Sequence, residues 1–176
     1  MVRVPEDPPL LRYKTSKIFI KTKRYLQTIM KKILFVCLGN ICRSPLAEGI
    51  AKDKAKNLNL DIYVDSAGTS SYHRGEKPCS NSIVIAKKYG IDISSQTSRP
   101  LNQNDIKNFD IIIAMDEQNK KDLLARGFHN VKKLGSFASY NNQDVPDPYY
   151  YDGLEGFELV YKMIDECIKD LLSTLK

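Results

Sequence analysis

Residues 33–45 are Ile33-Leu34-Phe35-Val36-Cys37-Leu38-Gly39-Asn40-Ile41-Cys42-Arg43-Ser44-Pro45. The first four form a short apolar run of β-rich composition, which is typical of a strand buried on both faces of a sheet. A glycine-containing turn follows, and Ser44-Pro45 has the composition of a helix start. The stretch therefore predicts a buried strand, a tight loop and a helix in direct succession.

Strands and helices are predicted to alternate along the rest of the chain. The predicted strands are 60–64, 109–114 and 131–134, and the predicted helices are 78–89, 102–108, 117–126 and 153–175. This alternation predicts an α/β fold, a Rossmann-like three-layer αβα sandwich around a central, four-stranded parallel sheet. Functional sites in such sheets lie beyond the carboxyl ends of the strands. We therefore expect a phosphate-binding loop directly after the first strand.

The composition is that of one globular domain. The chain has 176 residues, of which 42% are hydrophobic and 27% are charged, which suffices for one core and argues against wholesale disorder. No run approaches the roughly 18 apolar residues that a membrane-spanning helix needs. Four cysteines without an obvious signal peptide favour a reducing, cytoplasmic setting over a disulfide scaffold.

The positive charge is confined to the N-terminal leader, residues 1–30. The leader carries seven basic and two acidic side chains, so it accounts for +5 of the net charge of +6 and leaves residues 31–176 nearly neutral. This argues against a nucleic-acid partner. The basic, partly amphipathic stretch 13–29 could contact a membrane, but it is short and uncapped, so we expect a solvated or disordered tail. Met30 is an alternative start, and the predicted folded domain spans 31–176.

The loop after the first strand has the residues of an anion-binding site. Its intervening residues can curl so that several backbone N–H groups point inward at a helix N-terminus. Gly39 and Asn40 tolerate the positive φ that this curl requires. Arg43 adds a guanidinium that can bind two phosphate oxygens at once. The loop therefore predicts a site for a phosphate group.

The same loop has a candidate nucleophile. Helix N-termini and nearby cations stabilise the thiolate form of a cysteine, and Ser44 is placed to donate a hydrogen bond to the Cys37 sulfur. We therefore expect phosphoryl transfer to Cys37 and hydrolysis of the phosphocysteine, without a metal or other cofactor. Two alternatives compete: a lone cysteine is often a small buried hydrophobe, and Cys37 with Cys42 could bind zinc. No matching Cys/His pair follows at a usable spacing.

Four segments together resemble the low-molecular-weight protein tyrosine phosphatases. They are Phe35–Pro45, Asp65–Thr69, Ala114–Asp116 and Asp144–Tyr149, and the resemblance extends from Lys32 to the C-terminus. It implies that the chain hydrolyses phosphotyrosine in protein substrates through a phosphocysteine. Inorganic phosphate would then be both the product and a competitive ligand.

The resemblance also assigns roles to individual residues. Cys37 would be the nucleophile, Arg43 the phosphate clamp and Asp147 the general acid and base, with Asp144 and Asp152 as nearby rivals. The substrate-binding residues would be the rest of the loop with the aromatic rim, namely Leu38, Gly39, Asn40, Ile41, Cys42, Ser44, Tyr72, Tyr149 and Tyr150.

The other three cysteines and Tyr151 lie outside these catalytic roles. The resemblance makes Cys42 a backup thiol that can form a reversible disulfide with Cys37, whereas Cys79 and Cys167 are expected to be ordinary helix residues. Tyr151 is an extra residue relative to the family pattern, which leaves the register beyond Asp147 open.

Three rival functions share parts of this sequence pattern. Arsenate reductases of the same fold share the loop but use a pair of downstream cysteines, and Cys79 has no second cysteine in its helix. A related phosphoarginine phosphatase favours threonine at the position of Ile41. A phosphate-binding module without turnover would need neither a nucleophile nor an acid, so the set of Cys37, Arg43 and Asp147 argues against it.

Overall fold

The computed structural model describes residues 30–175. The predictions for the leader, apart from Met30, lie outside the described residues. The elements in chain order are β1 (Lys31–Cys37), α1 (Arg43–Asn57), β2 (Ile62–Gly68), α2 (Ser80–Lys88), α3 (Asp105–Asn108), β3 (Ile111–Ala114), α4 (Glu117–Ala125), β4 (Val131–Lys133), the 3-10 helix η1 (Pro148–Tyr150) and α5 (Glu155–Ser173). None of the helices in this range is long and apolar enough to cross a bilayer.

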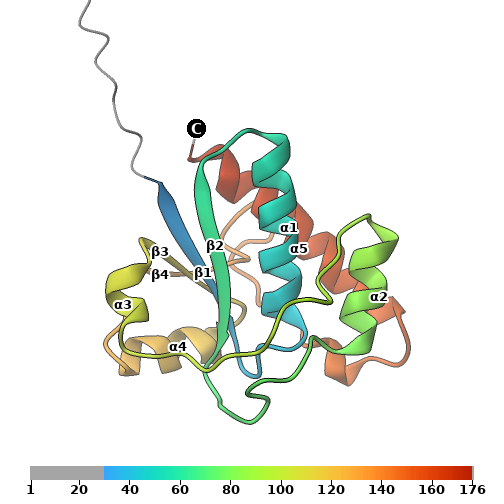
Figure 1. Ribbon diagram of the computed structural model, residues 1–176, viewed down its shortest axis with the longest axis horizontal. Coiled ribbons are helices and arrows are strands. Elements are labelled where there is room, and N and C mark those ends of the chain that lie inside the picture. Colours follow the sequence, from blue (N-terminus) through green and yellow to red (C-terminus); the bar gives the residue numbers. More distant parts are fainter. Residues whose placement is uncertain (1–29, 176) are drawn as a thin grey trace, which may run out of the picture.

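The four strands form one parallel sheet in the order β2-β1-β3-β4. Helices α1, α2 and α5 pack together over one face, and α3 and α4 lie on the other (Figure 1). The predicted three-layer αβα sandwich with a four-stranded parallel sheet is therefore confirmed.

β1 contributes to both cores because its side chains alternate between the two faces. Ile33, Phe35 and Cys37 belong to the cluster shared with α1 and α5, whereas Leu34 and Val36 belong to the cluster shared with α4. All five are buried. A strand that is covered on both faces can be apolar at every position, which explains the continuous apolar run in the sequence.

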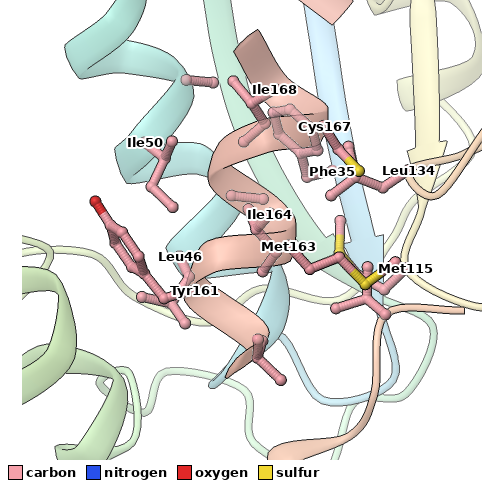
Figure 2. Close-up of a cluster of buried hydrophobic side chains, with 14 of the residues drawn as sticks. Phe35, Leu46, Ile50, Met115, Leu134, Tyr161, Met163, Ile164, Cys167 and Ile168 are labelled. Atoms are coloured by element: carbon pink, nitrogen blue, oxygen red, sulfur yellow. The ribbon is translucent and has the colours of Figure 1, made fainter. Parts of the chain in front are cut away.

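The larger core holds the end of β1 and the start of α1 in place. Figure 2 shows α5 packed beside α1 over the sheet, with Met163, Ile164 and Ile168 directed into the cluster. Their partners include Leu46 of α1 and Phe35 of β1. Because the end of β1 and the start of α1 are both anchored in this core, the loop between them has little freedom.

The carboxyl end of β2 lies against the loop that follows β1. Thr69 N donates to Cys37 O and Ser70 N donates to Leu38 O, both at 2.9 Å. A Cβ atom on Gly68 would lie 2.8 Å from Leu38 O, so a glycine is needed for this close approach. The contact brings the segment after β2, including Tyr72, to the same edge of the sheet.

Most predicted boundaries differ from the structure by a few residues, and two of the differences have a clear physical reason. β2 runs from Ile62 to Gly68 rather than over 60–64, because its polar end pairs with β1 up to Gly68. Helix α1 begins at Arg43, so Pro45 is its third residue and not its first. Proline is tolerated there because the first-turn N–H groups of a helix have no partner within the helix.

Candidate active site

The pocket floor, which we define as Cys37–Ser44, is built around the Cys37 sulfur. The side chain is buried, with 3% of the residue exposed. Asn40 N donates to Cys37 Sγ at 3.2 Å, and Ser44 Oγ lies 3.0 Å from the same sulfur. Asn40 has φ of 54°, which directs its N–H inward as the sequence predicted. These two contacts fix the position of the sulfur in the floor.

A buried polar network holds the floor from behind. Asn40 Nδ2 donates to Ser44 Oγ at 2.9 Å and to Ser66 Oγ at 2.8 Å, and Arg99 N donates to Asn40 Oδ1 at 2.9 Å. Ser66 Oγ in turn donates to Glu48 Oε2 at 2.6 Å. Because Ser44 accepts from the amide, its own proton remains available for the Cys37 sulfur. The network therefore supports both the loop conformation and the position of the sulfur.

Arg43 is buried between two carboxylates. Its Nη1 donates to Asp116 Oδ2 at 2.6 Å and to Val145 O at 3.3 Å, and its Nη2 donates to Asp147 Oδ2 at 3.0 Å. Burial by itself would lower the pKa of Arg43, but the negative charges of Cys37, Asp147 and Asp116 outweigh burial and raise it. The guanidinium therefore stays charged at the edge of the floor.

Asp116 is itself fixed at the start of α4. Its Oδ1 accepts a hydrogen bond from Asn119 N at 2.6 Å, so it caps the helix while Oδ2 holds Arg43. A cap of this kind satisfies one of the free N–H groups of the first turn. Arg43 is thus oriented by a residue that lies 73 positions further along the chain, between β3 and α4.

Of the three candidate acids, only Asp147 lines the pocket. Its side chain is 31% exposed, and its Oδ1 accepts from Tyr149 N at 3.1 Å. Asp144 is held elsewhere, because its Oδ1 accepts from Lys133 Nζ at 2.7 Å and from Glu117 N at 3.0 Å. Asp152 is exposed and does not line the pocket.

The predicted residues meet in one pocket of about 430 Å³. Its lining comprises Cys37, Leu38, Gly39, Ile41, Cys42, Arg43, Ser70, Tyr72, His73, Asp147, Tyr149 and Tyr150. Asn40 and Ser44, which were predicted to bind substrate, belong to the floor but are buried and do not line the pocket. Tyr72, Tyr149 and Tyr150, which we call the rim, are 91%, 83% and 83% exposed.

The comparisons with known proteins agree with this geometry. Residues 32–176 match the family described as low molecular weight phosphotyrosine protein phosphatase. A putative low molecular weight protein-tyrosine-phosphatase of Synechocystis is 40% identical over 152 residues, which cover 82% of this chain and 96% of that protein. The chain belongs to the low molecular weight phosphotyrosine protein phosphatase family.

Two solved structures show the same fold. The crystal structure of a protein tyrosine phosphatase from Entamoeba histolytica matches with a TM-score of 0.78 and 39% identity, and covers 82% of this chain and 96% of its own. A Drosophila arginine phosphatase matches with a TM-score of 0.76 and 34% identity, and covers 82% and 98%. This phosphatase fold therefore occurs with more than one kind of phosphorylated side chain.

Several residues of this phosphatase site were not singled out from the sequence. Asp116, Ser66 and Glu48 support the floor from other elements, and the first two lie in segments that carry the family resemblance. His73 also lines the pocket, where a Cβ added to Gly39 would lie 2.8 Å from His73 Cδ2. Within residues 30–175, no group of three or more His, Cys, Asp or Glu side chains could hold a metal ion.

Proposed function

We propose that this chain hydrolyses phosphotyrosine in protein substrates through a phosphocysteine on Cys37. Arg43 clamps the phosphate, and Asp147 is the general acid and base. The observation that carries the proposal is the meeting of three groups in one pocket: a buried sulfur that accepts an N–H, a charged guanidinium and a partly exposed carboxylate. A binding module would need the guanidinium alone.

Substrate binding would rearrange the Arg43 ion pairs. The free site holds Arg43 Nη2 on Asp147, whereas Nη1 is held by Asp116 at the back. A bound phosphate competes with Asp147 for Nη2, because a guanidinium binds a phosphate with two parallel hydrogen bonds. Asp147 is then released towards the ester oxygen. Asp116 keeps the guanidinium in place during the exchange.

The chemical steps follow from these positions. The Cys37 thiolate attacks phosphorus in line with the ester oxygen, and Asp147 donates a proton to the departing phenolate. A water then attacks the phosphocysteine, Asp147 accepts its proton, and inorganic phosphate leaves. The loop N–H groups and Arg43 stabilise the charge on the three equatorial oxygens in both steps.

The lining favours an aromatic ester. Leu38, Ile41 and the rim provide apolar and aromatic surface around the floor, which suits a flat ring. Because a relative of similar fold is an arginine phosphatase, phosphoarginine is the first competing substrate. Ile41 places an aliphatic side chain, not a hydroxyl, against the substrate group, so we expect phosphotyrosine to be the better substrate.

The test compares three substrates with the full-length protein. We expect turnover of phosphotyrosine peptides in the presence of EDTA, inhibition by vanadate and by inorganic phosphate, and an acidic optimum. Phosphoarginine should be hydrolysed more slowly, and arsenate with thioredoxin should not be reduced. Faster hydrolysis of phosphoarginine, or reduction of arsenate, would replace this proposal with the corresponding rival.

A further inference from the structure

A second pair of thiols lies beside the pocket floor. Cys79 directly precedes α2, and its N–H donates to Ile41 O at 2.7 Å, which brings it next to Cys42. Each thiol is near enough to the other to shift its pKa. Ser82 joins them further, since Ser82 Oγ donates to Cys42 O at 3.3 Å and lies 3.1 Å from Cys79 Sγ. Two cysteines 37 positions apart are thus neighbours, joined through Ile41 and Ser82.

Of the two thiols of the pair, Cys42 is the one that lies in the pocket with the nucleophile. Cys42 lines the pocket together with Cys37, and the negative charge of a Cys37 thiolate contributes to raising the pKa of Cys42. Cys79 does not line the pocket, so Cys42 is the member of the pair that shares the pocket with Cys37. Both Cys42 and Cys79 are partly buried at the edge of the main core. The three sulfurs therefore form a sequence of Cys37, Cys42 and Cys79.

The two thiols of the pair differ in their protonation. The hydrogen bond from Cys42, followed by bonds to the side chain and backbone of Ser82, outweighs burial and lowers the pKa of Cys79 to about 6. The same contact with Cys79, together with burial, raises the pKa of Cys42. The thiolate is the attacking species in disulfide exchange. In the reduced pair, Cys79 is therefore the thiolate and Cys42 the thiol.

We propose that Cys79 is a resolving thiol that forms a disulfide with Cys42 and so returns an oxidised Cys37 to its active form. The proposal rests on the proposed function, because it assumes that Cys37 is the reactive thiolate of the floor. It differs from a simple backup disulfide between Cys37 and Cys42, which would leave the nucleophile blocked.

Three steps with hydrogen peroxide as oxidant balance the reaction. The Cys37 thiolate attacks the peroxide, which oxidises sulfur to the sulfenic acid and releases hydroxide that takes a proton to become water. Cys42 sulfur attacks the sulfenic sulfur, its proton leaves with the hydroxyl as a second water, and the Cys37–Cys42 disulfide forms. The Cys79 thiolate then attacks Cys42 Sγ, so the Cys42–Cys79 bond forms and the Cys37 thiolate departs with the electron pair.

The consequence is a site that survives one oxidising equivalent. Two thiols of the pair are oxidised and one peroxide is reduced to two waters, while Cys37 ends as it began. The product disulfide lies beside the floor and not across the nucleophile. Without Cys79, the second step would be the last, and turnover would stop until an external thiol reduced the enzyme.

The experiment uses the reduced full-length protein, freed of reductant and treated with one equivalent of hydrogen peroxide. Free thiols are alkylated, disulfides are mapped by mass spectrometry after non-reducing digestion, and aryl phosphate turnover is measured before and after. The wild type should contain the Cys42–Cys79 disulfide, an alkylated Cys37 and most of its turnover. Cys79→Ser should contain the Cys37–Cys42 disulfide and lose turnover by about tenfold or more until dithiothreitol is added.

A matched control separates the pair from cysteine loss in general. Cys167 lies within the core on α5, near Leu134 (Figure 2), where its Sγ donates to Phe137 O at 3.4 Å. Cys167→Ala should therefore respond to peroxide like the wild type. Cys79→Ser in its reduced form should turn over substrate at the wild-type rate, which shows that its folded site is intact.

Two results would overturn the proposal. One is a wild type whose only disulfide joins Cys37 to Cys42, and this result needs no variant. The other is a Cys79→Ser protein that keeps its turnover after peroxide as the wild type does. A failure of the proposed function looks different, because the reduced wild type would then hydrolyse no phosphate ester before any peroxide is added.

Discussion

The floor and the rim of the pocket are built in opposite ways. Floor residues such as Asn40 and Ser44 are buried and hydrogen-bonded before any ligand arrives, and the network reaches from the Cys37 sulfur to Glu48. The three rim tyrosines are largely exposed, and Tyr149 and Tyr150 contact each other edge to face with centroids 5.5 Å apart. The floor is therefore preorganised for phosphate, whereas the rim can adapt to the rest of the substrate.

The difference assigns separate tasks to the two regions. Groups that stabilise charge in a transition state are most effective when they need no rearrangement at the moment of reaction. A surface that contacts many protein substrates gains more from flat, exposed aromatic side chains. Substitutions in the floor should therefore reduce turnover, and substitutions in the rim should change apparent affinity.

The largest effect is expected for Cys37→Ser. The serine hydroxyl is a much weaker nucleophile than a thiolate, so aryl phosphate turnover should fall below detection. Binding of vanadate or inorganic phosphate should persist, because the loop N–H groups and Arg43 remain. Calorimetry of phosphate binding and a turnover assay measure the two properties. Residual turnover near the wild-type rate would place the nucleophile elsewhere.

Asp147→Ala should give the next largest effect. General acid catalysis contributes about 10²–10⁴-fold, and it matters most for a leaving group that departs poorly. Turnover of phenyl phosphate should therefore fall far more than turnover of p-nitrophenyl phosphate. Asp152→Ala is the matched control, because Asp152 is an exposed carboxylate outside the pocket. Equal losses on both esters would argue against Asp147 as the acid.

Asn40→Ala tests whether the floor depends on its buried network. The substitution removes the donor to Ser44 and Ser66 and the acceptor of Arg99 N, and it should lower the free energy of unfolding by about 1–3 kcal/mol. Chemical denaturation measures this change. Asn59→Ala is the control, since Asn59 has nearly the same φ of 52° but is exposed. A loss of the same size in both variants would reflect backbone strain alone.

Tyr72→Ala should have a small effect that is confined to substrate affinity. Loss of one aromatic contact costs about 0.5–1.5 kcal/mol, so KM for a phosphotyrosine peptide should rise from a few-fold to about tenfold. The kcat value and the inhibition constant of inorganic phosphate should remain unchanged, because neither depends on the rim. Steady-state kinetics with phosphate as inhibitor separates these quantities. A lower kcat would give the rim a part in the chemistry.

The last prediction concerns Cys79 beside the floor, where the expected effect is on the ionisation of the thiol and not on turnover of the reduced enzyme. Because its pKa is lowered to about 6, the thiolate should persist above this pH and be lost as pH falls through it. Iodoacetamide labelling of reduced protein, followed by peptide mapping, should therefore be half-maximal near pH 6 at Cys79. An ordinary thiol is half-ionised near pH 8.5. A midpoint near that value would contradict the assignment of the thiolate to Cys79.

The local patterns of the sequence predicted most of the fold. The run at 33–36 and the alternation of elements are short-range features, so the parallel sheet and its covering helices could be predicted before any contact was known. The exact ends of the strands and helices were harder to predict. Ser66 to Gly68 look like a closing turn, but pairing with β1 makes them part of β2.

The candidate site also has one part that local sequence predicted and another part that it did not. Cys37, Arg43 and Ser44 lie within eight residues, so the link between a strand, a loop and a helix start was sufficient to bring them together. Asp147 came from the family resemblance, because nothing in its own segment separates it from Asp144. The structure makes that distinction: Lys133 and Glu117 hold Asp144 away, while Arg43 holds Asp147 at the pocket.

The sequence by itself determined the secondary structure, the layer architecture and the core of the phosphate loop, since all three depend on residues that are near neighbours along the chain. Only the tertiary structure decided that Asp116 orients Arg43, that Glu48 lies at the end of the network behind Asn40, and that Cys79 lies next to Cys42. These contacts depend on the register of the sheet and the packing of helices upon it. Both arise from interactions between distant segments, which no local pattern encodes.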